Sequence, residues 1–326
     1  MRIETRVIRG DRVESVHTGE AVVLDNNRQT VFASERPEYA FYARSSLKPF
    51  QVYPLVASGA ARGYGLSVKE LAVCCASHNG ETMHVGTVSD LQGRTGIREE
   101  MLRCGVHAPM DKDAAEALFR SDLELSQNYN NCSGKHTGML LLAKHLGVSF
   151  EGYIEADHPV QQRIFNYISS LVGRKDIHLG IDGCSVPTYY LTLRELAGLF
   201  LELISSNDPS LQQIREAMMR EPYLVAGRER FDTDIMKACR GRVVSKTGAE
   251  GVRGIGIRSD GESYGLALKV ADGGKRASAT MALGILGYLG LWNPDENPVL
   301  DKYQRPILRN HRGIEVGFLE TEIIES

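Results

Sequence analysis

The stretch AVVLDNNRQTVFA, residues 21–33, decides the fold. Two short apolar runs, residues 21–24 and 30–33, lie on either side of the Asp25-Asn26-Asn27 step. Aspartate and asparagine between two runs of this kind are typical of a β-hairpin. The preceding run RVESVH, residues 12–17, alternates in the same manner. We therefore expect short strands across residues 3–34.

The second half of the chain contains a similar set of runs. VVSK (243–246), GIGI (254–257) and GLALKV (265–270) have strand character, with a turn at 259–261. Between the two sets the sequence is mostly helical. Ser67 and Glu70 have the spacing of a capping box, and Asp157 is a plausible N-cap before Pro159. Apolar residues recur at helical intervals in Leu191 to Ile204 and in Leu211 to Met219.

Strands from both ends of the chain with helices between them predict an α+β (mixed α/β) fold. We expect one antiparallel sheet, completed by the two chain ends and flanked by helices. The sequence has no repeats and no clear linker, so residues 1–326 are interpreted as a single domain. A helical lobe at about residues 60–240 is the alternative within that domain.

Composition excludes several classes of function. The formal net charge of −3 provides no basic field for nucleic acid. The longest apolar stretch, residues 280–292, is about half of the ~20 residues that a membrane helix needs. Six cysteines and a start without an apolar signal segment favour reduced thiols in a cytoplasmic protein. We expect a small-molecule substrate, with no nucleic acid and no membrane.

Three short motifs occur in the order that serine–lysine acyl-transfer enzymes use. They are Ser45-Ser46-Leu47-Lys48, Ser77-His78-Asn79 and Lys246-Thr247-Gly248. Residues three apart share one face of a helical turn, so Lys48 could take the proton of Ser45. Burial and a second cation would both favour the neutral amine that this role requires.

Each motif also has a purely structural interpretation. A serine before an apolar helix is often an N-cap, and Gly80 after Ser77-His78-Asn79 is typical of a helix end. Lys246 could be an exposed strand residue. The joint order of the three motifs favours the catalytic interpretation.

Two cysteines lie among polar residues that could hold a metal. Cys132 precedes an apolar helix in the run NNCSGKH (130–136), and Cys184 follows Asp182-Gly183. Thiolates suit a soft divalent cation such as zinc, although neither the C-x-x-C nor the H-x-x-H spacing is present. Inert or redox-active cysteines therefore remain an alternative on the residues alone.

Five segments together resemble the Rhizobium etli-type (class 3) L-asparaginases. They are RSSLKPFQ (44–51), CASHNGE (75–81), NCSGKH (131–136), DGC (182–184) and KTGAEG (246–251). The resemblance runs over roughly residues 5–290. It implies a fold similar to serine β-lactamases and glutaminases, a homodimer, and hydrolysis of the side-chain amide of L-asparagine to aspartate and ammonia.

Carried over by position, the resemblance implies a role for each of twelve residues. Ser45 would be the nucleophile with Lys48 as its base, and Ser77 with Lys246 would form a second Ser–Lys pair. A Zn²⁺ ion that shapes the substrate pocket would be a cofactor. Its ligands would be Cys132, Lys135 and Cys184, and the substrate would contact Arg44, Asn79, His136, Asp182 and Asp232. Asp232 is a departure from the family pattern, because relatives can carry a cysteine in this segment.

Three rival functions remain open at this point. A glutaminase or another small-amide amidase would share the motifs, and comparison of asparagine with glutamine separates them. A β-lactamase or penicillin-binding relative would hydrolyse nitrocefin instead. A non-catalytic sensor that uses Cys132 and Cys184 as a zinc or thiol switch would release no ammonia.

Overall fold

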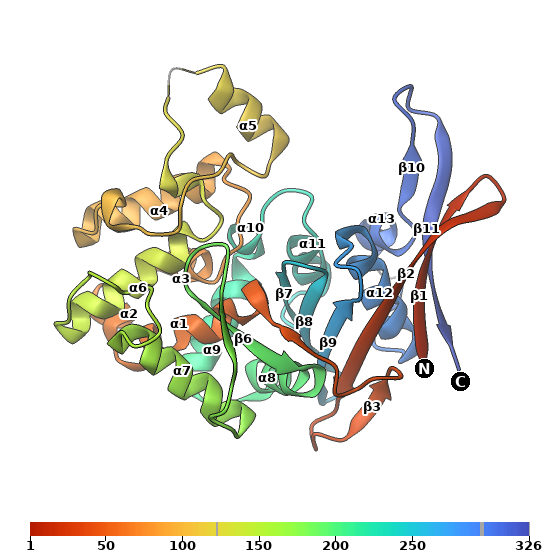
Figure 1. The fold of residues 1–326 in the computed structure, drawn as a ribbon, viewed down its shortest axis with the longest axis horizontal. Coiled ribbons are helices and arrows are strands. Elements are labelled where there is room, and N and C mark those ends of the chain that lie inside the picture. The colour runs from red at the N-terminus through yellow and green to blue at the C-terminus, as the bar shows by residue number, and fades with distance from the viewer. Residues whose placement is uncertain (122, 294–296, 326) are drawn as a thin grey trace. The chain divides into compact units, whose positions relative to one another are not determined.

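The computed structural model describes residues 1–121, 123–293 and 297–325. These residues form two compact units. Unit 1 comprises residues 1–46, 191–205 and 234–326, and unit 2 comprises residues 47–190 and 206–233. The chain passes from one unit to the other several times, so each unit is assembled from segments far apart in sequence. Figure 1 labels the elements of both units.

The strands have the following bounds: β1 (Arg2–Arg9), β2 (Arg12–Leu24), β3 (Thr30–Ala33), β4 (Ala40–Tyr42), β5 (Leu179–Ile181), β6 (Pro187–Thr192), β7 (Val243–Gly248), β8 (Val252–Ser259), β9 (Glu262–Val270), β10 (Ile307–Arg309) and β11 (Glu315–Ile324).

The helices have the following bounds: α1 (Lys48–Ala57), α2 (Ala60–Gly63), α3 (Val68–Cys74), α4 (Thr82–Thr95), α5 (Lys112–Phe119), α6 (Ser133–Leu146), α7 (Pro159–Val172), α8 (Leu193–Ser205), α9 (Pro209–Arg220), α10 (Pro222–Val225), α11 (Phe231–Ala238), α12 (Lys275–Tyr288) and α13 (Asp301–Gln304). Short 3₁₀ turns are η1 (Arg44–Leu47), η2 (Glu99–Met101), η3 (Gln127–Tyr129) and η5 (Pro298–Leu300).

Unit 1 is built on one antiparallel sheet with strands from both chain ends. The strand order is β10-β11-β1-β2-β9-β8-β7, and β3 pairs with β2 beside this path. The hairpin predicted at residues 25–27 joins β2 to β3, and the turn predicted at 259–261 joins β8 to β9. The α+β class and the sheet completed by both ends are thus confirmed.

Helices α8 and α12 cover the two faces of this sheet. Gly254 of β8 allows the first of them to approach, because a Cβ atom there would overlap the ring of Phe200 in α8. On the opposite face, Gly19 of β2 lies against Met281 of α12 in the same way. The core of unit 1 therefore lies in two layers, one on each side of the sheet.

Unit 2 is helical and is centred on α6. The residues of α6 from Ser133 to Ala143 are all buried, and this helix packs against α1, α3 and α4. The predicted capping box begins α3: the Ser67 side chain accepts from the backbone N–H of Glu70, and the Glu70 carboxylate accepts from that of Ser67. No helix in the described part of the chain is both long and apolar enough to span a bilayer.

One local prediction was wrong. His158, not Asp157, caps α7: its side chain accepts from the backbone N–H of Val160, and Pro159 is the first helical residue. The imidazole ring nitrogen can accept this bond as a carboxylate would, and proline directly after the cap sets the helix start at residue 159. The predicted helices at 191–204 and 211–219 correspond to α8 and α9.

Candidate functional site

The two adjacent serines of the first motif have different surroundings. Both lie in η1, which begins at Arg44, a residue with the left-handed φ of +53°. Ser46 is fully buried, and its hydroxyl donates to the carbonyl of Ala43 at 2.6 Å. Ser45 is partly exposed. Because the Ser46 hydroxyl is committed inside the protein, Ser45 is the serine that a substrate can reach.

Lys48 is the first residue of α1 and is 1% exposed. Its Nζ donates to the carbonyl of Ala76 and, at 3.2 Å, to the carbonyl of Asn131. These carbonyls belong to the residues directly before Ser77 and Cys132. The amine is therefore held between the second motif and the cysteine segment, and its role as a general base stays a prediction.

The Ser77-His78-Asn79 segment is not a helix end. α3 ends at Cys74, and the segment continues in extended form beside residues 225–226. The backbone N–H of Ser77 donates to Val225 O at 3.0 Å, and that of Asn79 donates to Ala226 O at 2.9 Å. Ser77 is 5% exposed. Gly80 has the predicted left-handed conformation, with φ +76°, but it ends this extended segment.

His78 has a structural environment. Its Nδ1 accepts from the backbone N–H of Gly80 at 3.1 Å, which leaves Nε2 to donate to Ser133 Oγ at 2.9 Å. Its ring stacks on His84, whose ring stacks on Tyr223. Burial, with His84 and Lys48 nearby, holds the pKa of His78 well below its usual range. The imidazole is therefore neutral at pH 7 and supports the segment on which Ser77 lies.

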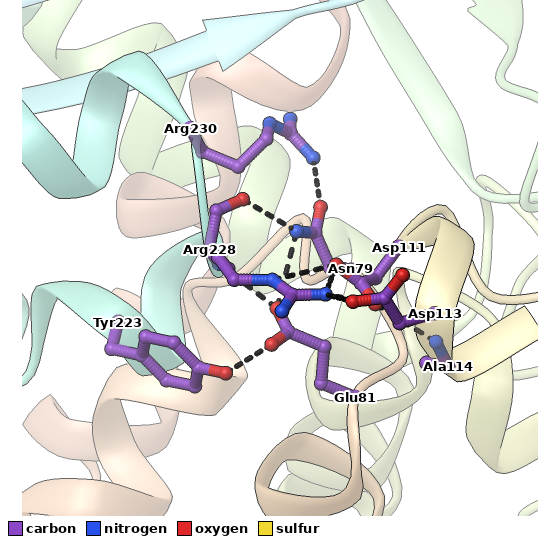
Figure 2. A network of polar contacts seen from close by, with 8 residues as sticks. All are labelled: Asn79, Glu81, Asp111, Asp113, Ala114, Tyr223, Arg228 and Arg230. Carbon is purple, nitrogen blue, oxygen red and sulfur yellow. Dashed lines mark hydrogen bonds and ion pairs between the residues drawn. The ribbon is translucent and has the colours of Figure 1, made fainter. Parts of the chain in front are cut away.

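Asn79 is engaged at both ends of its side chain (Figure 2). Its Oδ1 accepts from Arg230 Nη1 at 2.7 Å. Its Nδ2 donates to Glu81 Oε1 at 3.1 Å and to the carbonyl of Arg228 at 3.0 Å. Glu81 in turn accepts from the backbone N–H of Arg228 at 2.9 Å and from the Tyr223 hydroxyl. These bonds join the second motif to residues 227–230.

Gly227 makes this junction possible. Its φ of +125° lies in a region that only glycine adopts readily. A Cβ atom there would lie 2.5 Å from Glu81 Oε1 and 2.6 Å from Asn79 Nδ2. The close approach of the two segments therefore depends on the missing side chain.

The side chain of Arg228 connects this junction to α5. Its guanidinium pairs with Asp111 at 2.9 Å and with Asp113 at 2.6 Å. The hydrogen bonds that Arg228 donates to these carboxylates raise its pKa. Asp111 is also the N-cap of α5, where it accepts from the backbone N–H of Ala114. Arg228 therefore has a complete set of anionic partners.

Cys132, Lys135 and Cys184 come together within unit 2. All three are buried, and Lys135 Nζ lies 3.1 Å from Cys184 Sγ. A hydrogen bond from Cys184 is the largest cause of a strongly lowered pKa at Cys132, ahead of burial, which raises it. The same bond raises the pKa of Cys184. This hydrogen bond therefore favours the thiolate form at Cys132 over that at Cys184.

The donor set fits the zinc ion that the sequence predicts. Two thiol sulfurs and an amine nitrogen are soft or borderline ligands, and they converge without a disulfide. Burial lowers the pKa of Lys135, but the charges of Cys184 and Cys132 raise it more, so the amine is protonated here. Among the described residues no three His, Cys, Asp or Glu side chains are grouped for a metal, so a zinc site here would need Lys135 as its third ligand and stays a prediction.

His136 lies beside this cluster and is fully buried. Its Nδ1 and the Tyr153 hydroxyl are 2.6 Å apart, and its Nε2 has no hydrogen-bond partner among the described residues. Burial lowers the pKa of His136 to about 4. An unpaired nitrogen inside the protein is costly, which favours a ligand or water at this position. Whether that ligand is the substrate stays a prediction.

The third motif lies in unit 1 on β7. Lys246 is fully buried and pairs in the sheet with Gly254, while its Nζ donates to the carbonyl of Thr247 at 2.8 Å. Lys246 is therefore not an exposed strand residue, which was the alternative to a catalytic role. Gly248 ends the strand, with its backbone close to the carbonyl of Ala43, just before Arg44.

Asp182 and Asp232, the other two predicted substrate contacts, belong to unit 2. Asp182 is half-buried, accepts from the backbone N–H of Gly183 at 2.7 Å, and is near enough to Lys135 to affect its pKa. Asp232 is 2% exposed, in the first turn of α11. Their roles, like those of Arg44 and Asn79, stay predictions.

Glu81, Arg228 and Arg230 were not predicted as site residues. All three are charged residues of types that usually lie at the surface. Their hydrogen bonds join segments that are about 150 residues apart in the sequence. Gly227 directly before the charged run RER (228–230) was the available signal, because a glycine there permits a close backbone approach.

Comparison with known proteins places these motifs in a family. The model of the family described as L-asparaginase II matches residues 5–321. No curated protein sequence matches the chain.

Among solved structures, the chain is similar to a β-lactamase from Sphaerobacter thermophilus, with 16% identity, a TM-score of 0.43, and coverage of 85% of this chain and 94% of that one. It is also similar to a putative β-lactamase from Bacteroides dorei, with 13% identity, a TM-score of 0.43, and coverage of 82% and 93%. A third is the octameric penicillin-binding protein homologue from Pyrococcus abyssi, with 12% identity, a TM-score of 0.40, and coverage of 90% and 79%. These TM-scores describe a loose likeness.

The family match is the stronger finding, because it spans both units of the structure. Its range includes each of the three serine–lysine motifs as well as the Cys132, Lys135 and Cys184 cluster. The resemblance drawn from five separate segments is thereby confirmed. The chain belongs to the L-asparaginase II family.

Proposed function

We propose that this enzyme hydrolyses the side-chain amide of L-asparagine through an acyl-enzyme on Ser45, with Lys48 as the general base. The match to the L-asparaginase II family over residues 5–321 is the observation that supports this reaction. The accessible Ser45, beside a Ser46 that is committed to Ala43, supports the choice of nucleophile. Ser77 and Lys246 are the second Ser–Lys pair.

The reaction begins when the neutral Lys48 amine takes the proton of Ser45 and the serine oxygen attacks the amide carbon. The carbonyls of Ala76 and Asn131 accept from Lys48 Nζ, so they stabilise the ammonium that this step creates. The proton then passes to the departing nitrogen, and ammonia leaves. Water attacks the remaining ester, which releases aspartate and returns the proton to Ser45.

A zinc ion held by Cys132, Lys135 and Cys184 belongs to the same proposal. When bound, the ion supplies a positive charge that fixes the shape of the substrate pocket. Lys135 would have to lose its proton to bind, as a metal requires of its amine ligand. Asp182, which is close enough to Lys135 to influence it, would then contact the substrate's ammonium group.

Ammonia release tests the reaction and its nucleophile together. The wild type should release ammonia from L-asparagine, and Ser45→Ala and Lys48→Ala should lose turnover by at least about 10²-fold while staying folded. Ser46→Ala is the matched control: it removes a neighbouring buried hydroxyl and should keep turnover close to the wild-type value. Substantial activity in Ser45→Ala would refute the mechanism.

Two further measurements settle the finer points. Parallel assays with L-glutamine separate an asparaginase from a glutaminase. Metal analysis, with assays before and after chelation, tests the zinc ion, and no ammonia from any amide together with thiol-dependent association would support the sensor instead. We also infer a cytoplasmic homodimer, which sedimentation and cell fractionation test.

A further inference from the structure

Two arginines in one short loop of unit 2 have opposite electrostatic surroundings. Arg228 pairs with the carboxylates of Asp111 and Asp113. Arg230, two residues later, has no carboxylate within ion-pair distance among the described residues. Its guanidinium makes one hydrogen bond, from Nη1 to Asn79 Oδ1. Four of its five N–H donors are therefore available.

The one bond that Arg230 makes fixes where its guanidinium lies. Asn79 cannot turn its amide over, because Nδ2 already donates to Glu81 and to the carbonyl of Arg228. Oδ1 is thus the only end that can face Arg230. Glu81 is itself held by the Tyr223 hydroxyl and by the backbone N–H of Arg228 (Figure 2). The guanidinium is therefore oriented by a chain of satisfied bonds.

The positive charge of Arg230 affects the pKa of His78 in the second motif. The ring of His78 responds chiefly to burial, which lowers its pKa, and the positive charges of Lys48 and Arg230 lower it further. Arg230 is half-buried, so solvent screens it only in part. Two acidic side chains of this junction are already engaged: Glu81 by Asn79, and Asp111 by Arg228. The positive charge of Arg230, which has no ion-pair partner among the described residues, therefore lies beside Asn79 of the second motif.

We infer that Arg230 is a specificity residue that binds the α-carboxylate of the substrate, and that Asn79 acts indirectly by orienting it. A guanidinium with a free edge binds a carboxylate through two parallel hydrogen bonds, and such a bond distinguishes an amino acid from a simple amide. This inference rests on the proposed function, because it takes the substrate to be an amino-acid amide.

The test compares ligands that differ only in that group. L-Aspartate, the product, is titrated into the wild type beside β-alanine, which is aspartate without its α-carboxylate, and binding is followed by calorimetry. The variants are Arg230→Ala, Arg230→Lys and the matched control Arg120→Ala, which removes an exposed arginine that pairs with Glu116. KM and kcat for L-asparagine are measured on the same proteins, and thermal melting checks each fold.

Arg230→Ala should weaken L-aspartate binding and raise KM for asparagine by about 10- to 100-fold, with kcat changed by less than about threefold. β-Alanine should bind this variant and the wild type equally. Arg230→Lys should recover part of the loss, because it restores charge without the planar fork, and Arg120→Ala should leave both values within about twofold.

Equal losses for aspartate and β-alanine in Arg230→Ala, or no loss for aspartate, would overturn the inference. If Arg230→Ala does not fold, aspartate and β-alanine binding are compared in Arg230→Lys instead. Lysine keeps the positive charge but cannot make the two parallel hydrogen bonds of a guanidinium. If the wild type binds aspartate but releases no ammonia from asparagine, the proposed reaction fails while the binding comparison still decides Arg230. A wild type that binds no aspartate would refute the inference directly.

Discussion

At the scale of single residues, hydrogen bonds within the protein already occupy several polar atoms of the site, and this decides which residues can touch a substrate. The Ser46 hydroxyl is bonded to Ala43, so the neighbouring Ser45 is left as the reactive group. Both ends of the Asn79 amide are bonded within the protein, so its influence on a substrate passes through Arg230. Accounting for each donor and acceptor therefore separates residues that touch the substrate from residues that hold them.

Gly227 provides a test of the junction at this scale. Gly227→Ala should lower the free energy of unfolding by at least about 1–3 kcal/mol, because φ +125° strains any residue with a Cβ and the new atom meets Glu81 and Asn79. Urea denaturation measures the change. Gly173→Ala is the control, since Gly173 also has a positive φ but no atom within 4 Å of its Cβ position. Equal losses in the two variants would show that contact with Glu81 and Asn79 is unimportant.

Zinc binding should depend on pH in a direction that Lys135 sets. The pKa of this lysine is raised because the charges of Cys184 and Cys132 outweigh burial. The metal must displace its proton, so zinc affinity should rise between pH 6.5 and pH 8.5. Competition with a fluorescent chelator measures this slope. Lys135→Met should bind more weakly and with a shallower slope, and an unchanged slope would remove Lys135 from the ligand set.

At the scale of elements, local patterns were predictable and long-range contacts were not. The Ser67 and Glu70 capping box and the hairpin at 25–27 depend on residues a few positions apart, and both are present. The extended segment at Ser77 was interpreted as a possible helix end because Gly80 suits either role. Its true partners are residues 225–226, and nothing in a short window of sequence can indicate a pairing at that separation.

The capping box makes a testable prediction about pH. Burial alone would raise the pKa of Glu70, but bonds from Arg94 and Ser67 lower it below its ordinary 4.5. Its stabilising effect is therefore present above pH 4.5 and is lost as the pH falls through the lowered value. Glu70→Gln should cost on the order of 1 kcal/mol at pH 7 and progressively less below pH 4.5, as measured by urea denaturation.

Ser67→Ala tests the other half of the box. It removes the cap to the Glu70 backbone N–H and also the hydroxyl bond to the Glu70 carboxylate, so it should cost about 1 kcal/mol at pH 7 and somewhat less below pH 4.5. A loss in Glu70→Gln that did not shrink in acid would show that the carboxylate charge has no part in the stabilisation.

At the scale of the whole molecule, both chain ends meet in the sheet of unit 1. β1 lies between β2 and β11, so the first strand of the chain pairs with the last. Strands at residues 3–34 and 243–270 were predicted, whereas β11 was not. Only one of its ten residues, Leu319, is buried, so its sequence lacks the apolar alternation by which strands are recognised. The family match, which ends at residue 321, includes most of this strand.

β11 should therefore be necessary for unit 1 although it buries little. A chain ending at Gln304 lacks β10 and β11, and the free edge of β1 would then be open to pairing with other molecules. Such a chain should aggregate or melt at a much lower temperature than the full chain, as light scattering and calorimetry can measure.

Two point variants separate the causes of that loss. Leu319→Ala, opposite Val7 in the sheet, should cost about 2–5 kcal/mol by opening a gap in the core. Glu322→Gln removes the half-exposed ion pair with Arg6 and should cost less than about 1 kcal/mol. If the chain ending at Gln304 remained monomeric with an unchanged melting temperature, the sheet would be stable without its last strand, and the pairing of the two chain ends would be dispensable.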